Sequence, residues 1–222
     1  MPRLAGKTIV IIGAGADGAG PLAQRLALLG AQIIAIGPLE APLLPLARLH
    51  PEKIEVLAMD FHDLAACRRL ARLWGREPVH GLINLMPLAA PVEPAQLALE
   101  TVVTIMRPAL MAGQGAVVCL APAPAPAIAP ATAPATAPAT PPVGAGAGAH
   151  ARLAAVAFAA HQQHMALLAQ ARAAQGITVA MVALAPGLAL AASAPLLAFL
   201  SAAPRPNLGG LCFPLRCGAQ SD

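Results

Sequence analysis

The feature that most constrains the fold of this chain is an alternation of short apolar runs with segments of helical periodicity. Each run is almost continuously apolar, which is typical of strands that are buried on both faces of a sheet. The expected strands lie at 8–12, 32–36, 54–59, 79–86, 115–121 and 177–184, and the run at 211–215 offers a seventh. The expected helices lie between them, at 21–29, 41–49, 63–74, 94–111 and 150–175.

This alternation predicts an α/β fold, a doubly wound parallel sheet of the Rossmann-like type with helices on both faces. We expect the strand order 3-2-1-4-5-6. The 222 residues suffice for one sizeable core and are too few for two ordinary domains, so residues 1–222 are expected to form a single domain.

A low-complexity segment, rich in proline and alanine, interrupts the alternation at residues 121–149. Recurrent proline blocks helices and sheet ladders and favours extended polyproline II. We expect this insertion to lie outside the core. It is interpreted either as a tolerated surface insertion or as a binding motif for a proline-recognising partner.

Composition argues against several classes of function. The net charge is +4, but only 11% of residues are charged and 2% are aromatic, and the arginines of 68–72 fall mostly off the apolar stripe of a helix. We therefore expect no nucleic-acid partner. The long uncharged stretch 176–204 is broken by prolines, which favours a buried strand over a membrane span. The N-terminus has no signal-peptide pattern and the four cysteines form no disulfide framework, so we expect a cytoplasmic protein.

A glycine-rich sequence, GAGADG, follows the first expected strand directly and precedes the first expected helix. Its glycines, Gly13, Gly15 and Gly18, with Gly20 beyond them, allow a tight turn and a close approach of the backbone to a pyrophosphate. The expected companion residue is missing, because the second strand ends in Gly37 and Pro38 rather than in an acid or an arginine. The pattern predicts a dinucleotide site that lacks the side chain which would bind the ribose at the end of the second strand.

These motifs, in this order, resemble the short-chain dehydrogenase/reductase family over nearly the whole chain. The resemblance includes AMDFHD, LINLMPLA and GITVAMVALAPG in addition to the glycine loop. It implies that Asp60 contacts adenine, that Asn84 ends the fourth strand beside the cofactor, and that Pro186 and Gly187 lie near the nicotinamide. The implied cofactor is NAD or NADP. Leu85, Met86 and Pro87 stand where the family keeps its backbone close to the ribose, so we expect weak or vestigial binding.

The family's catalytic residues are missing. The family uses a tyrosine as the general acid/base, a lysine four residues later, a serine after the fifth strand and an asparagine on the preceding helix. This chain has no tyrosine, and its only lysines are Lys7 and Lys53. Counting along the helix 150–175 places the tyrosine and lysine positions either at Ala154 and Phe158 or at Phe158 and Gln162. The serine falls near Ala121-Pro122 and the asparagine near Gln96. We therefore assign no catalytic residue.

Two histidines on the same helix are alternative candidates for chemistry. His161 and His164 are spaced i, i+3 and could face a site or bind a metal, but no carboxylate or cysteine ligand accompanies them in the sequence. We interpret them as residues of a solvated helix face and assign no metal site.

Three functions remain open. The first is a non-catalytic subunit, structural or regulatory, that partners an active dehydrogenase/reductase. The second is a divergent NAD(P)-dependent oxidoreductase acting on a carbonyl or alcohol, and the third is a dinucleotide-sensing regulatory protein. Family members pair the helices equivalent to 94–111 and 150–175. The second of these carries apolar residues around much of its circumference: Leu153, Val156, Phe158, Met165, Leu167 and Leu168. We therefore expect a homo-oligomer, or a hetero-oligomer with an active paralogue.

Overall fold

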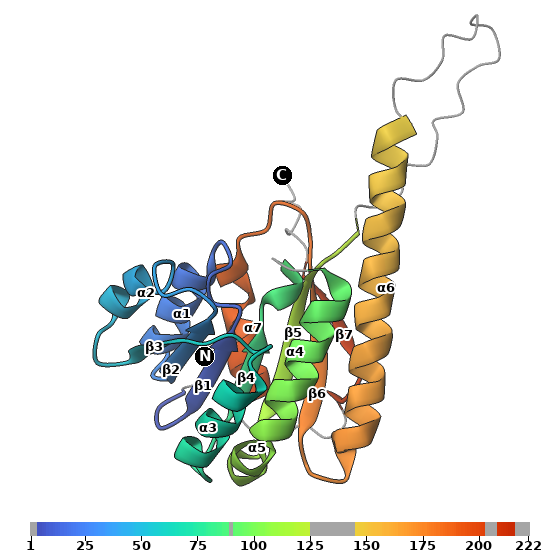
Figure 1. Cartoon of the computed structure of the whole chain (residues 1–222). Helices are drawn as coiled ribbons and strands as arrows, with labels where there is room; N and C mark the ends of the chain where they lie inside the picture. The colour runs from blue at the N-terminus through green and yellow to red at the C-terminus, as the bar shows by residue number, and fades with distance from the viewer. Residues whose placement is uncertain (1–3, 89–90, 125–144, 203–207, 216–222) are drawn as a thin grey trace, which may run out of the picture.

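The structure is a computed structural model, and it describes residues 4–88, 91–124, 145–202 and 208–215, with the side chains of 145–149 left out. Its centre is one sheet in which seven strands run parallel in the order β3-β2-β1-β4-β5-β6-β7 (Figure 1). The strands are β1 (Thr8–Ile12), β2 (Gln32–Gly37), β3 (Ile54–Ala58), β4 (Gly81–Asn84), β5 (Ala116–Pro122), β6 (Thr178–Leu184) and β7 (Cys212–Leu215). The predicted fold class and strand order are confirmed.

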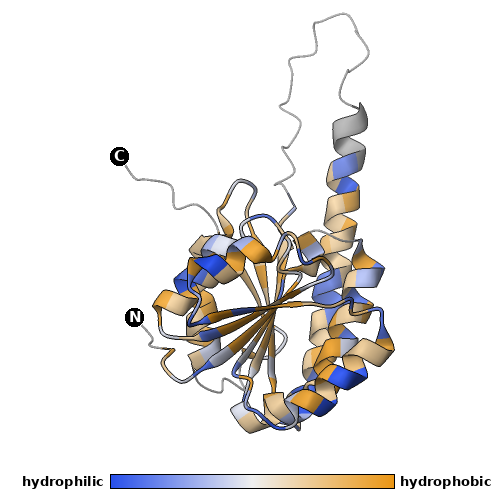
Figure 2. Cartoon of the chain, turned by 60° about the vertical axis from the view of Figure 1, so that its left-hand side comes forward, coloured by the Kyte–Doolittle hydropathy of each residue, from blue (hydrophilic) through white to orange (hydrophobic). Residues whose placement is uncertain are grey.

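The central strands are buried along nearly their whole length, as their apolar sequences require. All residues of β4 and β6 are buried, and only the first residue of β1 and the last of β5 are more exposed. Figure 2 shows this distribution, with apolar strands at the centre and polar residues on the outer faces of the surrounding helices. Burial on both faces is the reason that these strands show no alternation of polar and apolar residues.

Helices cover both faces of the sheet. One face packs against α1 (Ala19–Leu28), α2 (Leu44–Leu49) and α7 (Ala194–Ala202). The other packs against α3 (Leu64–Trp74), α4 (Val92–Ile105), α5 (Arg107–Gly113) and α6 (Ala145–Ala173). Two short 3-10 turns, η1 (Met86–Leu88) and η2 (Leu190–Ser193), follow β4 and β6.

The expected helix 94–111 is two helices. Helix α4 ends at Ile105, and α5 begins at Arg107 with Pro108 in its first turn. Proline has no backbone N–H and its ring clashes with the carbonyl four residues earlier, so a continuous helix through Pro108 is disfavoured.

The ends of the expected insertion 121–149 belong to regular structure, which corrects the prediction. Ala121 and Pro122 extend β5 and pair with Ala183 and Leu184 of β6, and Ala121 is buried in the core. Residues 145–149 begin α6, because their alanines favour a helix despite the intervening glycines. Residues 125–144 lie outside the described residues.

Helix α6 is the longest element, and its first turns extend beyond the sheet (Figures 1 and 2). Among the described residues, no helix combines the length and the apolar character needed to cross a membrane.

Candidate functional site

The glycine-rich loop connects β1 to α1 at the carboxyl edge of the sheet. Gly13 and Gly18 have φ angles of 74° and 81°, in the left-handed region that favours glycine. A Cβ atom on Gly13 would lie 2.8 Å from the backbone nitrogen of Met86, so glycine also permits the close approach of the loop to the segment after β4. These requirements explain the two glycines without reference to a ligand.

Several backbone N–H groups of this loop have no internal acceptor. The N–H groups of Ala14 and Ala16 donate to Ile36 and Gly13, whereas those of Asp17, Gly18 and Gly20 donate to no carbonyl of the described residues. They lie at the N-terminus of α1, where the helix dipole favours a negative charge. The loop is therefore suited to an anion such as a phosphate.

A cavity of about 740 Å3 opens beside this loop, and we call it the loop cavity. The glycine loop forms one wall, and the ends of β5 and β6 with the segment leading into η2 form the other. Among the predicted cofactor residues, it brings together Gly15, Gly18, Pro186 and Gly187. Leu190 of η2 also lines it and lies against Gly18, where a Cβ atom would be 3.1 Å from the Cβ of Leu190.

The other four predicted residues do not line the loop cavity. Gly13 packs against Met86, and Gly20 lies near Leu46 and Leu49 in the packing of α1 on α2. The Asp60 carboxylate accepts a hydrogen bond of 2.9 Å from the backbone N–H of His62. It holds the turn that follows β3.

Asn84 is buried, and both polar atoms of its side chain form hydrogen bonds within the chain. Its Oδ1 accepts from the backbone N–H of Met86 at 3.0 Å, and its Nδ2 donates to the Sγ of Cys119 at 3.6 Å. Burial raises the pKa of the Cys119 thiol to about 12. Asn84 therefore fixes the turn after β4 rather than facing a ligand.

A second cavity, of about 640 Å3, adjoins the first, and we call it the α6 cavity. The two cavities share Ala123, Ala185 and Pro186. Phe158 and Gln162, one turn apart on α6, face Cys212 and Leu215 of β7 across it. Ala154 is exposed and does not line it.

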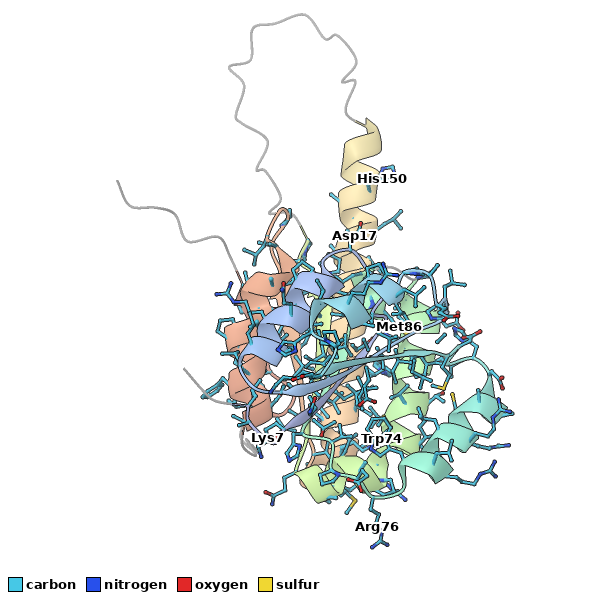
Figure 3. The ribbon with its side chains drawn as sticks, turned by 90° about the vertical axis from the view of Figure 1, so that its left-hand side faces the viewer. Lys7, Asp17, Trp74, Arg76, Met86 and His150 are labelled. Atoms are coloured by element: carbon cyan, nitrogen blue, oxygen red, sulfur yellow. The ribbon has the colours of Figure 1, made fainter. Side chains whose placement is uncertain are left out.

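The two cavities contain few groups that can exchange a proton. Among the described residues that line them, only Asp17 and Cys212 have titratable side chains. Burial raises the pKa of the Cys212 thiol, so this thiol is protonated at neutral pH. Both lysines precede strands, Lys7 before β1 and Lys53 before β3, and so lie at the amino edge of the sheet. In Figure 3, Lys7 and Asp17 lie toward opposite ends of the molecule.

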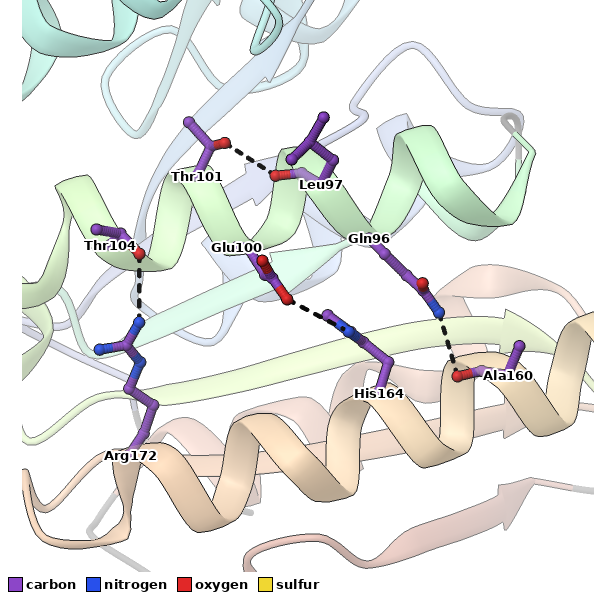
Figure 4. Close-up of polar contacts among 8 residues, drawn as sticks. All are labelled: Gln96, Leu97, Glu100, Thr101, Thr104, Ala160, His164 and Arg172. Carbon is purple, nitrogen blue, oxygen red and sulfur yellow. Dashed lines mark hydrogen bonds and ion pairs between the residues drawn. The ribbon is translucent and has the colours of Figure 1, made fainter.

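His161 and His164 do not contribute to either cavity. His161 is buried, and burial lowers the pKa of both imidazoles. The Nδ1 of His164 lies 3.6 Å from a carboxylate oxygen of Glu100 on α4 (Figure 4). The expectation of a solvated face is wrong for both histidines, because His161 is buried and the His164 side chain is only 13% exposed. No group of three or more metal-ligating side chains occurs in the described part of the chain.

The residues present fit a dinucleotide only in part. The unpaired N–H groups of Asp17, Gly18 and Gly20 fit its pyrophosphate. The Asp17 carboxylate in the same cavity is unfavourable for a phosphate, and the end of β2, at Gly37 and Pro38, offers no side chain for a ribose.

Sequence reasoning missed two of these features. Leu190 beside the loop and Cys212 in the α6 cavity both depend on how β6, β7 and α6 come together. The sequence carries no local signal for either.

No family model matches the sequence. No curated protein matches it.

Solved structures do match the fold over nearly the whole chain. The RhlG/NADP active-site complex from Pseudomonas aeruginosa is 18% identical, with a TM-score of 0.66, over 98% of this chain and 97% of that chain. A gluconate 5-dehydrogenase from Burkholderia cenocepacia J2315, in complex with NADP and tartrate, is 16% identical with a TM-score of 0.66, over 96% and 94%. A short-chain type dehydrogenase/reductase from Mycobacterium marinum is 16% identical with a TM-score of 0.65, over 96% and 94%. The chain therefore has the fold of the short-chain dehydrogenases/reductases.

Proposed function

We propose that this chain is a non-catalytic relative of the short-chain dehydrogenases/reductases and serves as a structural or regulatory subunit that partners an active enzyme. One observation carries the proposal. Phe158 and Gln162, one of the two pairs of positions at which the resemblance places the tyrosine and the lysine, line the α6 cavity beside the loop cavity. Neither side chain can donate a proton as an acid or accept one as a base at neutral pH.

The other catalytic positions support the same conclusion. The family's serine falls near Ala121-Pro122, within or at the end of β5, where neither residue has a hydroxyl. Its asparagine falls near Gln96, whose Nε2 donates to the carbonyl of Ala160 at 3.1 Å and ties α4 to α6 (Figure 4). Losing a positioned acid/base group alone costs about 10²–10⁴-fold in rate.

We further propose a residual and weak site for NAD or NADP at the loop cavity. The glycine loop and its unpaired N–H groups support binding, and two of the fold neighbours are complexes with NADP. Asp17 and the close approach of Leu190 to Gly18 oppose it. Among the predicted cofactor residues, we retain Gly15, Gly18, Pro186 and Gly187 as direct candidates.

The partner surface that we propose lies on the outer side of α6 and α4, and we call it the α4–α6 face. It is formed by exposed apolar side chains: Leu97, Leu153, Val156 and Leu167. Leu153 and Val156 are 69% and 68% exposed, more than is usual for large apolar groups in a helix that packs on a sheet. Met165 and Leu168, which we expected on this surface, are buried against the sheet of their own chain. The helix thus has two apolar sides.

A steady-state assay tests the loss of catalysis. The purified chain is incubated with NADPH or NADH and carbonyl substrates, and with NADP and gluconate, next to an active dehydrogenase as the positive control. We expect no turnover. Turnover that survives purification and is abolished by His161→Ala or His164→Ala would overturn the proposal and place the acid/base group on α6.

A divergent NAD(P)-dependent oxidoreductase is the second candidate, favoured by the NADP complexes among the fold neighbours. The third, a dinucleotide sensor, would signal through the proline-rich segment, of which residues 125–144 lie outside the described residues. We propose a cytoplasmic location for either role.

A further inference from the structure

The α6 cavity has the size and character of a small-molecule site. Its volume of about 640 Å3 falls within the roughly 300–1,000 Å3 of known ligand pockets. Its walls are mainly apolar, with Phe158, Pro186, Pro214 and Leu215 around the space. Such walls favour a ligand with an apolar body, because burial of apolar surface is the main source of affinity in such pockets.

Among the residues that the structure describes, no charged side chain lines the α6 cavity. The Cys212 thiol is neutral at physiological pH, because burial raises its pKa. An ionised ligand group placed here would lose its hydration without gaining an opposite charge, which is costly. The lining therefore disfavours carboxylates such as the tartrate bound by one of the fold neighbours.

Gln162 supplies a polar group at the cavity wall. It lies four residues after Phe158, so both side chains are on the same face of α6. Its side chain is exposed at the mouth of the cavity, and its amide offers two donors and an acceptor. The Gln162 amide can thus form a hydrogen bond with one polar group of a ligand.

We propose that the α6 cavity binds an uncharged small molecule that has an apolar body and a single hydrogen-bonding group, which pairs with the Gln162 amide. The inference rests on the proposed function in one respect, since the molecule is bound as a ligand and is not converted. A molecule bound in this cavity would contact α6, and the same helix carries exposed apolar side chains of the α4–α6 face.

Cys212 provides a readout that is specific to this cavity. It is partly exposed and lines the cavity, whereas Cys67 and Cys119 are buried. The full chain is alkylated with N-ethylmaleimide in the presence of octan-1-ol, octanoate or gluconate, and the modification of Cys212 is followed by peptide mass spectrometry. We expect octan-1-ol to slow it saturably, at a concentration at least tenfold lower than octanoate, and gluconate to have no effect.

Two variants of α6 test whether Gln162 is the residue that contacts the ligand. Gln162→Lys places a cation at the cavity wall and should reverse the preference, so that octanoate protects Cys212 better than octan-1-ol. Gln163→Lys is the matched control, because Gln163 is exposed and does not line the cavity. It should leave the preference unchanged. Failure of octan-1-ol to protect Cys212, or an equal effect of the two variants, would overturn the inference.

The outcome is separable from that of the proposed function, because the protection assay contains no dinucleotide. Oxidation of octan-1-ol after NADP is added would overturn the non-catalytic proposal, while protection with the predicted preference would still support the class of ligand. Absence of protection in a chain without turnover would overturn the inference alone.

Discussion

At the scale of single residues, two buried serines near the same face of the sheet have opposite roles. The Oγ of Ser193 in η2 donates to the carbonyl of Leu190 at 2.7 Å. The Oγ of Ser201 in α7 has no hydrogen-bond partner, and it packs against Gly81, where a Cβ atom would be 2.5 Å away. A buried hydroxyl without a partner costs about 1–3 kcal/mol, whereas a paired one contributes about 1 kcal/mol.

We therefore expect Ser201→Ala to raise the free energy of unfolding by about 1 kcal/mol and Ser193→Ala to lower it by a similar amount. The two substitutions remove the same atom, so each is the control for the other. Equilibrium denaturation with urea measures both. A loss of stability in Ser201→Ala equal to that of Ser193→Ala would contradict the assignment.

The candidate site was predictable at this scale only where backbone geometry demands a residue type. Glycine was expected at 13 and 18 of the loop, and both have φ angles in the left-handed region that favours it. Asp60 and Asn84 were assigned by resemblance, and in the structure their side chains hold turns of the chain itself. The sequence could not show this, because an aspartate or an asparagine is suited equally to a hydrogen bond within the chain and to a contact with a ligand.

At the scale of elements, polar contacts join α4 to α6 along their length (Figure 4). Gln96 donates to Ala160, Glu100 pairs with His164, and Arg172 donates to the Oγ1 of Thr104 at 3.2 Å. Beneath them, His161 is buried against the sheet side. These contacts fix the two helices that carry the α4–α6 face.

Three histidines make the folded state sensitive to acid. Burial lowers the pKa of His80, His161 and His164, and the Nδ1 of His80 accepts from the backbone N–H of Thr8 at 3.1 Å. Because these groups bind protons less readily in the folded chain, the unfolded chain binds more protons below the ordinary histidine pKa of about 6.5. The free energy of unfolding should fall as the pH drops from about 7 toward 5.

Urea denaturation at a series of pH values checks this. His161→Gln should reduce the fall between pH 7 and pH 5, and the control His62→Gln, on the exposed turn after β3, should not. Glu100 raises the pKa of His164 and so opposes the effect of burial there. We therefore expect His161 to contribute more than His164 to the pH dependence of stability. Stability that stays constant or increases over this range would contradict the prediction.

Elements were predictable where hydrophobic periodicity was uninterrupted. The six strands expected along the chain and the optional seventh all occur in the predicted order. Their boundaries were less well predicted, because Pro108 divides one helix and Pro122 extends β5 beyond the expected strand. Helix α3 begins at Leu64, one residue after the expected start, because Asp63 caps it and its carboxylate accepts from the N–H groups of Ala65 and Ala66.

At the scale of the whole molecule, the two cavities lie together at the carboxyl edge of the sheet, and the α4–α6 face lies on one of its sides. Lys7 and Lys53, the lysines of this chain, are at the amino edge. The molecule thus has the fold of the short-chain dehydrogenases/reductases and an exposed apolar surface, and the described residues where the two cavities meet include no acid/base pair.

The exposed apolar side chains predict a dimer or tetramer in solution. Leu153→Lys or Leu167→Lys should shift the assembly toward monomer, because a charge buried at an apolar interface lacks a partner. Leu28→Lys is the control, since Leu28 is 72% exposed on α1, on the opposite face of the sheet. Sedimentation velocity at micromolar concentration measures the result. A stable wild-type monomer, unaffected by these charges, would remove the basis for the partner hypothesis.

Cofactor binding should be weak. We expect dissociation constants above roughly 100 μM for NAD(H) and NADP(H), equivalent to less than about 5.5 kcal/mol. Isothermal titration calorimetry with the four nucleotides in parallel measures them. Removing the carboxylate beside the loop, by Asp17→Asn, should tighten binding of NADP(H). Micromolar binding by the wild-type chain would contradict the expectation.

The proposal that the chain is non-catalytic is tested most directly by following hydride transfer itself. The wild-type chain, at high concentration, is incubated with nicotinamide cofactor deuterated at C4 and with carbonyl substrates, and the products are examined for deuterium by mass spectrometry. An active dehydrogenase is the positive control, and the cofactor is kept well above 100 μM so that weak binding does not limit the result. We predict no deuterated alcohol above the protein-free background. Deuterated alcohol formed in proportion to the concentration of the chain would contradict the account.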